Sequence, residues 1–60
     1  MNRRHAVIKK NPGGGFLVEI HIRHHPHVRT QTFRVYSEAR TWALDNVQQD
    51  PDRVTVEEMS

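Results

Sequence analysis

Arginine and histidine are the residues of this chain with the most informative chemistry. Guanidinium groups donate paired hydrogen bonds to phosphate or guanine, and imidazoles titrate near neutral pH and bind metals. Nine Lys/Arg stand against seven Asp/Glu, a net charge of +2. Residues 1–40 hold eight of these cations, all five histidines and two carboxylates, whereas residues 41–60 hold one arginine and five carboxylates. Such an asymmetric field attracts polyanions to one part of the chain and repels them from the other.

The histidines concentrate around His24-His25-Pro26-His27, with His21 three residues earlier. A tetrahedral zinc site needs a fourth ligand, and this segment has neither a cysteine nor a nearby carboxylate. We therefore predict no metal and no cofactor. The imidazoles instead predict a patch whose positive charge grows as the pH falls towards about 6.

Two antiparallel strands are expected at residues 4–10 and 16–24, joined by the turn Asn11-Pro12-Gly13-Gly14-Gly15. The second strand alternates strictly, with one apolar side and one mainly polar side. The apolar side is Phe16, Val18, Ile20 and Ile22; the other is Leu17, Glu19, His21 and Arg23. An antiparallel sheet with one covered face and one exposed face follows from this pattern.

A third strand is predicted at residues 29–36, with Phe33 and Val35 towards the core and Thr32, Arg34 and Tyr36 on the opposite side. The period then changes to that of a helix, predicted at residues 38–49 with Ser37 as its N-cap. Its apolar stripe is Ala39, Trp42, Ala43 and Val47. Proline at position 51 ends it, and residues 53–57 alternate as a short strand.

These elements predict an α+β fold in a single domain, residues 1–60. It is a small two-layer domain with a three-stranded antiparallel sheet, possibly extended by a fourth C-terminal strand, packed on one α-helix in the order β-β-β-α-(β). Trp42, the only tryptophan, is expected at the centre of the core.

The segment Phe33–Trp42 carries the pattern Phe-x4-Glu-Ala-x2-Trp, in which Glu38 and Ala39 are the middle members. This pattern resembles the last strand and helix of the N-terminal arm-type DNA-binding domains of phage and transposon integrases. The glycine-rich turn before Phe16 is similar to the first turn of that family, so the resemblance spans roughly residues 5–49. It implies a three-stranded sheet whose exposed face enters the DNA major groove.

The predicted nucleic-acid surface is the sheet face turned away from the helix. His21, Arg23, Arg34 and Tyr36 should project from it, and His5 and Lys9 can join them. Arg23 and Arg34 are expected to contact guanine or phosphate, whereas four other cations would mainly bind the nucleic-acid backbone. Those four are Arg3, Arg4, Lys9 and Lys10. The partner is DNA or RNA.

The alternative is a protein-binding module. The acidic segment Asp45–Glu58, or an exposed edge strand, would contact a host protein, as small phage proteins that inhibit bacterial RNA polymerase do. Charge reversal at Glu57 and Glu58 would then abolish activity while Arg23→Ala is silent.

No arrangement of nucleophile, base and oxyanion donors is visible, so we expect neither an enzyme nor a small-molecule substrate. The absence of a long apolar run predicts no contact with a membrane, and a cytoplasmic location is expected.

Overall fold

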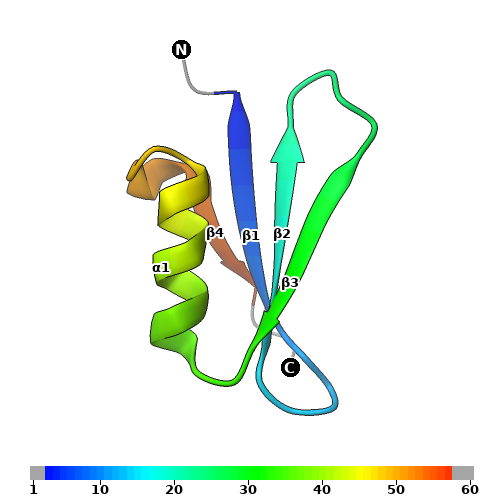
Figure 1. Cartoon of the computed structure of the whole chain (residues 1–60), viewed down its shortest axis with the longest axis vertical. Coiled ribbons are helices and arrows are strands. Elements are labelled where there is room, and N and C mark those ends of the chain that lie inside the picture. Colours follow the sequence, from blue (N-terminus) through cyan, green and yellow to red (C-terminus); the bar gives the residue numbers. More distant parts are fainter. Residues whose placement is uncertain (1–2, 58–60) are drawn as a thin grey trace.

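The structure is a computed structural model that describes residues 3–57. Its elements follow the predicted order, including the C-terminal strand (Figure 1). They are β1 (Arg4–Lys10), β2 (Phe16–Ile22), β3 (Val28–Phe33), α1 (Tyr36–Asn46), the short 3-10 helix η1 (Pro51–Arg53) and β4 (Val54–Glu57). The α+β prediction is confirmed.

The four strands form one sheet in the order β3-β2-β1-β4. Both pairings within the first three strands are antiparallel, as predicted, whereas β4 runs parallel to β1 and makes the sheet mixed. The parallel pairing arises because α1 carries the chain across the sheet from one edge to the other. We call the end where β1 begins and β2 finishes the upper end, and the end with the turn of residues 11–15 the lower end (Figure 1).

The core lies between α1 and the sheet and is made of seven fully buried side chains. They are Ala6, Ile8, Val18, Ile20, Ala39, Ala43 and Val47. The predicted helical stripe is therefore confirmed for its three smaller members. Trp42, in contrast, is half-buried and packs on the core from its margin, with its ring 5.6 Å from that of Phe33. Two alanines on the contact line bring the helix close to the sheet, which leaves no room for an indole between them.

The start of α1 differs from the prediction. The N-cap is Val35, whose side chain makes no capping hydrogen bond, and Ser37 lies inside the first turn. The carbonyl of Ser37 accepts a hydrogen bond from Thr41 Oγ1 at 2.9 Å. Glu38 does occupy the first turn, where a carboxylate is favourable to the helix dipole.

The third strand ends at Phe33, three residues earlier than predicted, because the chain turns there to begin the helix. Its alternation does not continue, so Val35 is 49% exposed and the prediction that it faces the core is wrong. Tyr36 becomes the first residue of α1 and packs edge-on against Phe16, with ring centroids 5.6 Å apart.

The helix ends at Asn46 rather than at residue 49. Gln48 and Gln49 adopt left-handed backbone angles, with φ of 58° and 60°, which stop the helix and turn the chain towards η1. The side chain of Asp50 then accepts a hydrogen bond from the amide of Asp52 at 3.1 Å and fixes the start of η1. Within residues 3–57, no helix has the length and apolar character needed to cross a membrane.

Candidate nucleic-acid interface

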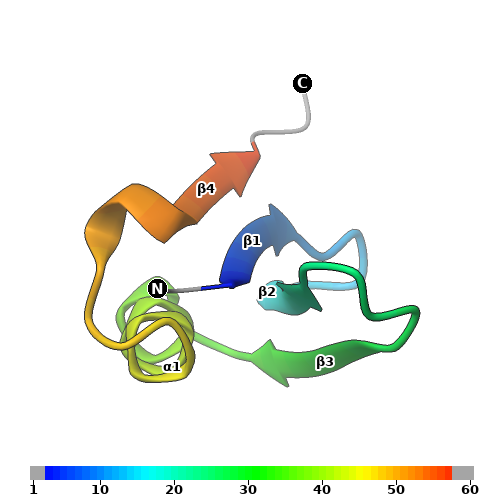
Figure 2. The same ribbon diagram turned by 90° about the horizontal axis from the view of Figure 1, so that it is seen from above.

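The sheet face opposite α1 is not covered by any helix or strand of residues 3–57 (Figure 2). We call it the open face. Because side chains alternate along a strand, the residues between the buried ones project from it. These residues include His5, Val7 and Lys9 from β1, Leu17, Glu19 and His21 from β2, and Thr30 and Thr32 from β3. The predicted positions of His5, Lys9 and His21 on this face are confirmed.

The middle of the open face carries no excess of positive charge, because its one cation lies between two carboxylates. Lys9 Nζ is 3.4 Å from Glu19 Oε1 on β2 and 3.6 Å from Glu57 Oε2 on β4. Glu57 is the direct partner of Lys9 in the β1–β4 register. Glu19 is the partner of Val7, which lies two residues before Lys9 on the same face of β1. The charge of Lys9 is thus matched within the protein, and this lysine offers little attraction to an external phosphate.

Glu19 also accepts a hydrogen bond from His21, whose Nε2 lies 3.1 Å from Oε1. That hydrogen bond lowers the pKa of Glu19, partial burial opposes the shift, and Lys9 lowers the pKa further. An ionised carboxylate only accepts hydrogen bonds, so Nε2 of His21 carries the proton. The imidazole is thereby held in one orientation beside the upper end of the face.

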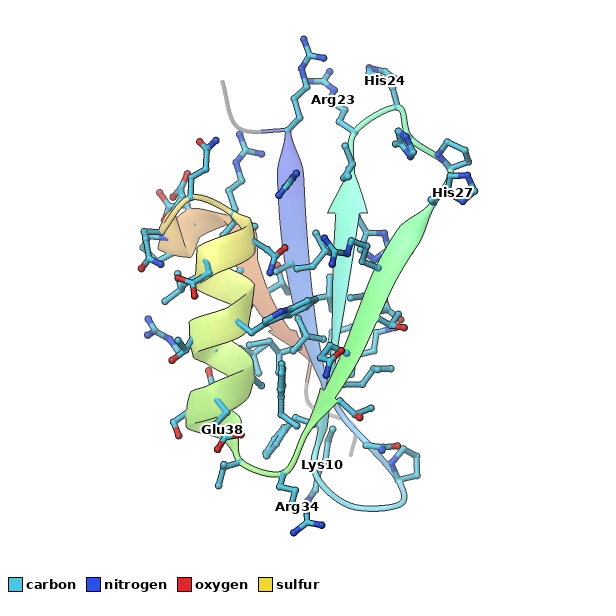
Figure 3. The ribbon with its side chains drawn as sticks, in the orientation of Figure 1. Lys10, Arg23, His24, His27, Arg34 and Glu38 are labelled. Atoms are coloured by element: carbon cyan, nitrogen blue, oxygen red, sulfur yellow. The ribbon has the colours of Figure 1, made fainter. Side chains whose placement is uncertain are left out.

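A pocket of about 460 Å³ opens at the upper end of the sheet. Three arginines, three histidines and one isoleucine line it, and no carboxylate is among them. The lining residues are Arg3, His5, His21, Ile22, Arg23, His24 and Arg53. We call this the cationic pocket. Arg23 and His24 mark its end of the molecule in Figure 3.

Three segments that are distant in sequence build the cationic pocket. His5 and His21 are direct partners in the β1–β2 register, and the amide of Arg23 donates to the carbonyl of Arg3 at 2.9 Å. The parallel pairing of β4 with β1 places Arg53 beside the beginning of β1. Backbone pairing therefore fixes the positions from which these side chains enter the pocket.

The turn after β2 carries the other histidines. His24 has a left-handed backbone, with φ of 63°, and the amide of His25 donates to the carbonyl of Ile22 at 3.0 Å. The rings of His25 and His27 lie 5.4 Å apart. In the described part of the chain, no group of three or more His, Cys, Asp or Glu side chains is arranged to hold a metal ion.

Arg34 and Lys10 do not reach the cationic pocket, although they belong to the predicted surface. Both lie at the lower end of the sheet, far from Arg23 (Figure 3). Antiparallel pairing is the reason: Phe33 lies opposite Phe16, the first residue of β2, so the residue after β3 and the residue after β2 are at opposite ends. Arg23 and Arg34 therefore lie at opposite ends of the sheet and do not form one local cluster.

Arg4 and Tyr36 also lie away from the open face. Arg4 occupies the helix side of β1, where its Nη1 lies 3.4 Å from the carbonyl oxygen of Asn46 at the end of α1. Tyr36 packs against Phe16 on the side that α1 covers. Of the eight predicted residues, Arg3, His21 and Arg23 therefore meet in the cationic pocket.

Sequence reasoning missed Arg53 and His24 as members of the pocket. Arg53 is the only cation within the acidic residues 41–60, and that isolation was the one available signal. Its placement depends on the parallel pairing of β4 with β1, which strand periodicity does not predict.

A second hollow, of about 380 Å³, runs along α1. It is lined by Phe33, Ser37, Glu38, Thr41, Trp42 and Asp45. We call it the helix groove; its lining includes two aromatic side chains and two carboxylates.

The acidic residues of the proposed protein-binding segment do not form one surface. Asp45 borders the helix groove, Asp50 caps η1, and Glu57 pairs with Lys9 on the open face. Glu58 lies outside the described residues.

Comparison with protein-family models, with curated proteins and with solved structures finds no match for this chain.

Proposed function

We propose that this protein binds nucleic acid, with duplex DNA as the first ligand to test, through the cationic pocket and the adjoining upper end of the open face. The observation that carries the proposal is the convergence of three arginines and three histidines in one hollow that no carboxylate of residues 3–57 lines. The three arginines carry like charges that repel one another, so a bound anion relieves the repulsion. Phosphate is the anion that the planar guanidinium fork fits best.

The contacts expected from this geometry are mainly with the sugar–phosphate backbone. The three arginines bind phosphates and fix the position of the strand, whereas the middle of the open face carries an internally paired lysine. The threonines of β3 and the imidazole of His21 supply hydrogen bonds to a ligand that extends from the pocket along the sheet. Such an interface predicts affinity that depends strongly on salt and weakly on base sequence.

The salt dependence of affinity tests the proposal. Three phosphate contacts predict a slope of about −3 in a plot of log K against log salt for duplex DNA. Affinity should then fall about 60-fold between about 50 and 200 mM salt. Fluorescence anisotropy with a labelled duplex measures this slope.

Arg23→Ala and Arg34→Ala form a matched pair, because both arginines are exposed and follow the end of a strand. Arg23→Ala should reduce the slope to about −2, and Arg34→Ala should leave it at about −3. A flat salt response of the wild type, or equal effects of the two variants, would contradict binding at the cationic pocket.

Protein recognition is the second candidate, and the helix groove is the observation that favours it. Trp42 and Phe33 form its apolar floor, and Glu38 and Asp45 border it. An exposed tryptophan face beside carboxylates suits a lysine or arginine side chain, through cation–π attraction and ion pairing. The expected partner is therefore a cationic segment of another protein.

Trp42 is the only tryptophan and reports on this groove directly. An oligolysine peptide should change its fluorescence, and Glu38→Lys should abolish the change while Arg23→Ala preserves it. No response to the peptide would remove this second candidate and leave the nucleic-acid proposal unaffected.

A further inference from the structure

The cationic pocket has more arginines than contact with a single backbone phosphate requires. A phosphodiester carries one negative charge and two non-bridging oxygens. A phosphate monoester carries up to two charges near neutral pH and three such oxygens. Arg3, Arg23 and Arg53 line the hollow from separate segments, and each guanidinium can donate two parallel hydrogen bonds.

We propose that the cationic pocket is a site for a phosphate monoester, either the terminal phosphate of a nucleic-acid strand or that of a free nucleotide. The strand form rests on the proposed function. Three arginines line one hollow. A monoester offers three terminal oxygens to their guanidinium groups, whereas an internal phosphodiester would leave at least one arginine without a charged partner.

The size of the hollow supports a ligand larger than inorganic phosphate. Its volume of about 460 Å³ corresponds to roughly 15 water molecules at their share of the liquid volume. A phosphate with its attached sugar fits in that space. Ile22 gives the wall an apolar part on which the sugar can rest, and the imidazoles of His5 and His24 add polar groups.

The route away from the pocket also suits a strand end. Beyond His21 the open face continues to Lys9, which lies between the carboxylates of Glu19 and Glu57. The middle of the face therefore offers little attraction to a phosphate chain. A strand on this face would gain most of its binding from its terminal phosphate, at the cationic pocket.

The test compares two single strands of identical sequence, one with a 5′-phosphate and one with a 5′-hydroxyl, by anisotropy at about 150 mM salt. The phosphorylated strand should bind about ten-fold more tightly, since hydrogen bonds to charged groups are each strong enough to account for such a factor. The label is placed at the 3′ end of both strands, so that only the 5′ group differs.

Arg23→Lys and Arg34→Lys are the matched variants, because lysine keeps the charge and loses the planar fork. Arg23→Lys should reduce the ten-fold preference to about two-fold or less; the preference is the ratio of the two affinities of the same variant, so a general loss of binding does not change it. Arg34→Lys, at the lower end, should preserve the preference. Circular dichroism confirms that each variant is folded.

The outcomes separate this inference from the proposed function. If both strands bind equally and with strong salt dependence, the phosphate-monoester site is refuted and nucleic-acid binding stands. If neither these strands nor duplex DNA binds but a nucleoside 5′-monophosphate binds the wild type and not Arg23→Ala, the site stands and the proposed function is refuted. If none of these ligands binds, both are refuted.

Discussion

The upper and lower ends of the sheet both carry arginine, yet they differ in how that charge is placed. At the upper end, residues from three segments converge on the cationic pocket. At the lower end, Lys10 and Arg34 are exposed and line neither of the two hollows described above (Figure 3). Between the ends, Lys9 is paired with two carboxylates. A count of cations does not identify a binding surface; what matters is whether the fold brings them together without counter-charges.

The backbone causes this difference. The parallel strand β4 begins at the upper end and brings Arg53 there, and the same strand ends near Lys9 and brings Glu57. One short strand therefore adds a cation to the pocket and a carboxylate to the middle of the face.

The largest expected effect concerns the buried core, which supports both ends of the sheet. Ile8 is fully buried in the middle of β1, whereas the neighbouring Val7 projects from the open face. Ile8→Ala should lower the free energy of unfolding by about 2–5 kcal/mol through lost burial and the cavity left behind. Val7→Ala should cost less than about 1 kcal/mol. Urea unfolding measures both, and equal losses would mean that the open face is also a packed interface.

The next effect tests the residue that sequence reasoning missed. Arg53→Ala should weaken binding of duplex DNA several-fold and reduce the salt slope by about one, because one phosphate contact is lost. Arg40→Ala, on the exposed side of α1, is the control and should leave the slope unchanged. A slope unaffected by Arg53→Ala would remove η1 from the proposed binding surface.

The interactions of Glu19 with Lys9 and His21 in the middle of the open face predict a smaller, pH-dependent effect on stability. The pKa of Glu19 is lowered in the fold from its ordinary 4.5. Its contribution to stability is therefore present above pH 4.5 and is lost as the pH falls through the lowered pKa. Glu19→Gln should cost less than about 1 kcal/mol at pH 7, since the pairs are partly exposed.

Urea unfolding of the wild type and Glu19→Gln at several pH values tests this sign. The difference between the two proteins should disappear below the lowered pKa of Glu19. A difference that persists or grows in acid would show that the ion pairs with Lys9 and His21 do not stabilise the fold.

The smallest effect concerns the loop that leads from α1 to the pocket. Gln48 is exposed and has a φ of 58°, a conformation that costs residues with a side chain about 1 kcal/mol relative to glycine. Gln48→Gly should therefore raise the unfolding free energy by a few tenths of a kcal/mol, after the entropic cost of glycine is deducted. DNA affinity should not change. Loss of stability in this variant would mean that the glutamine side chain holds the loop.

Sequence periodicity predicted the layers of this fold well. The alternation of β2 and the stripe of Ala39, Ala43 and Val47 identified the buried face of each element. The change to a helical period also located α1, although its start and end were misplaced. Those ends depend on backbone turns at Arg34–Val35 and at the two left-handed glutamines, for which the sequence offers no glycine.

The candidate site was only partly predictable. Alternation placed His5, His21 and Arg23 on one side, which identified three of the seven residues that line the pocket. Antiparallel order alone would have separated Arg23 from Arg34, because consecutive antiparallel strands finish at opposite ends of a sheet. The contribution of Arg53 was beyond sequence reasoning, since the partner and direction of a four-residue edge strand are set by tertiary packing.

The most direct test of binding at the upper end is a titration of the ¹⁵N-labelled protein with duplex DNA, followed by NMR. Amide shifts should concentrate at Arg3, His5, Arg23 and Arg53, and Lys10 and Arg34 should remain unshifted. Shifts that centre on the lower end or on α1, or no shifts at low salt, would contradict the account.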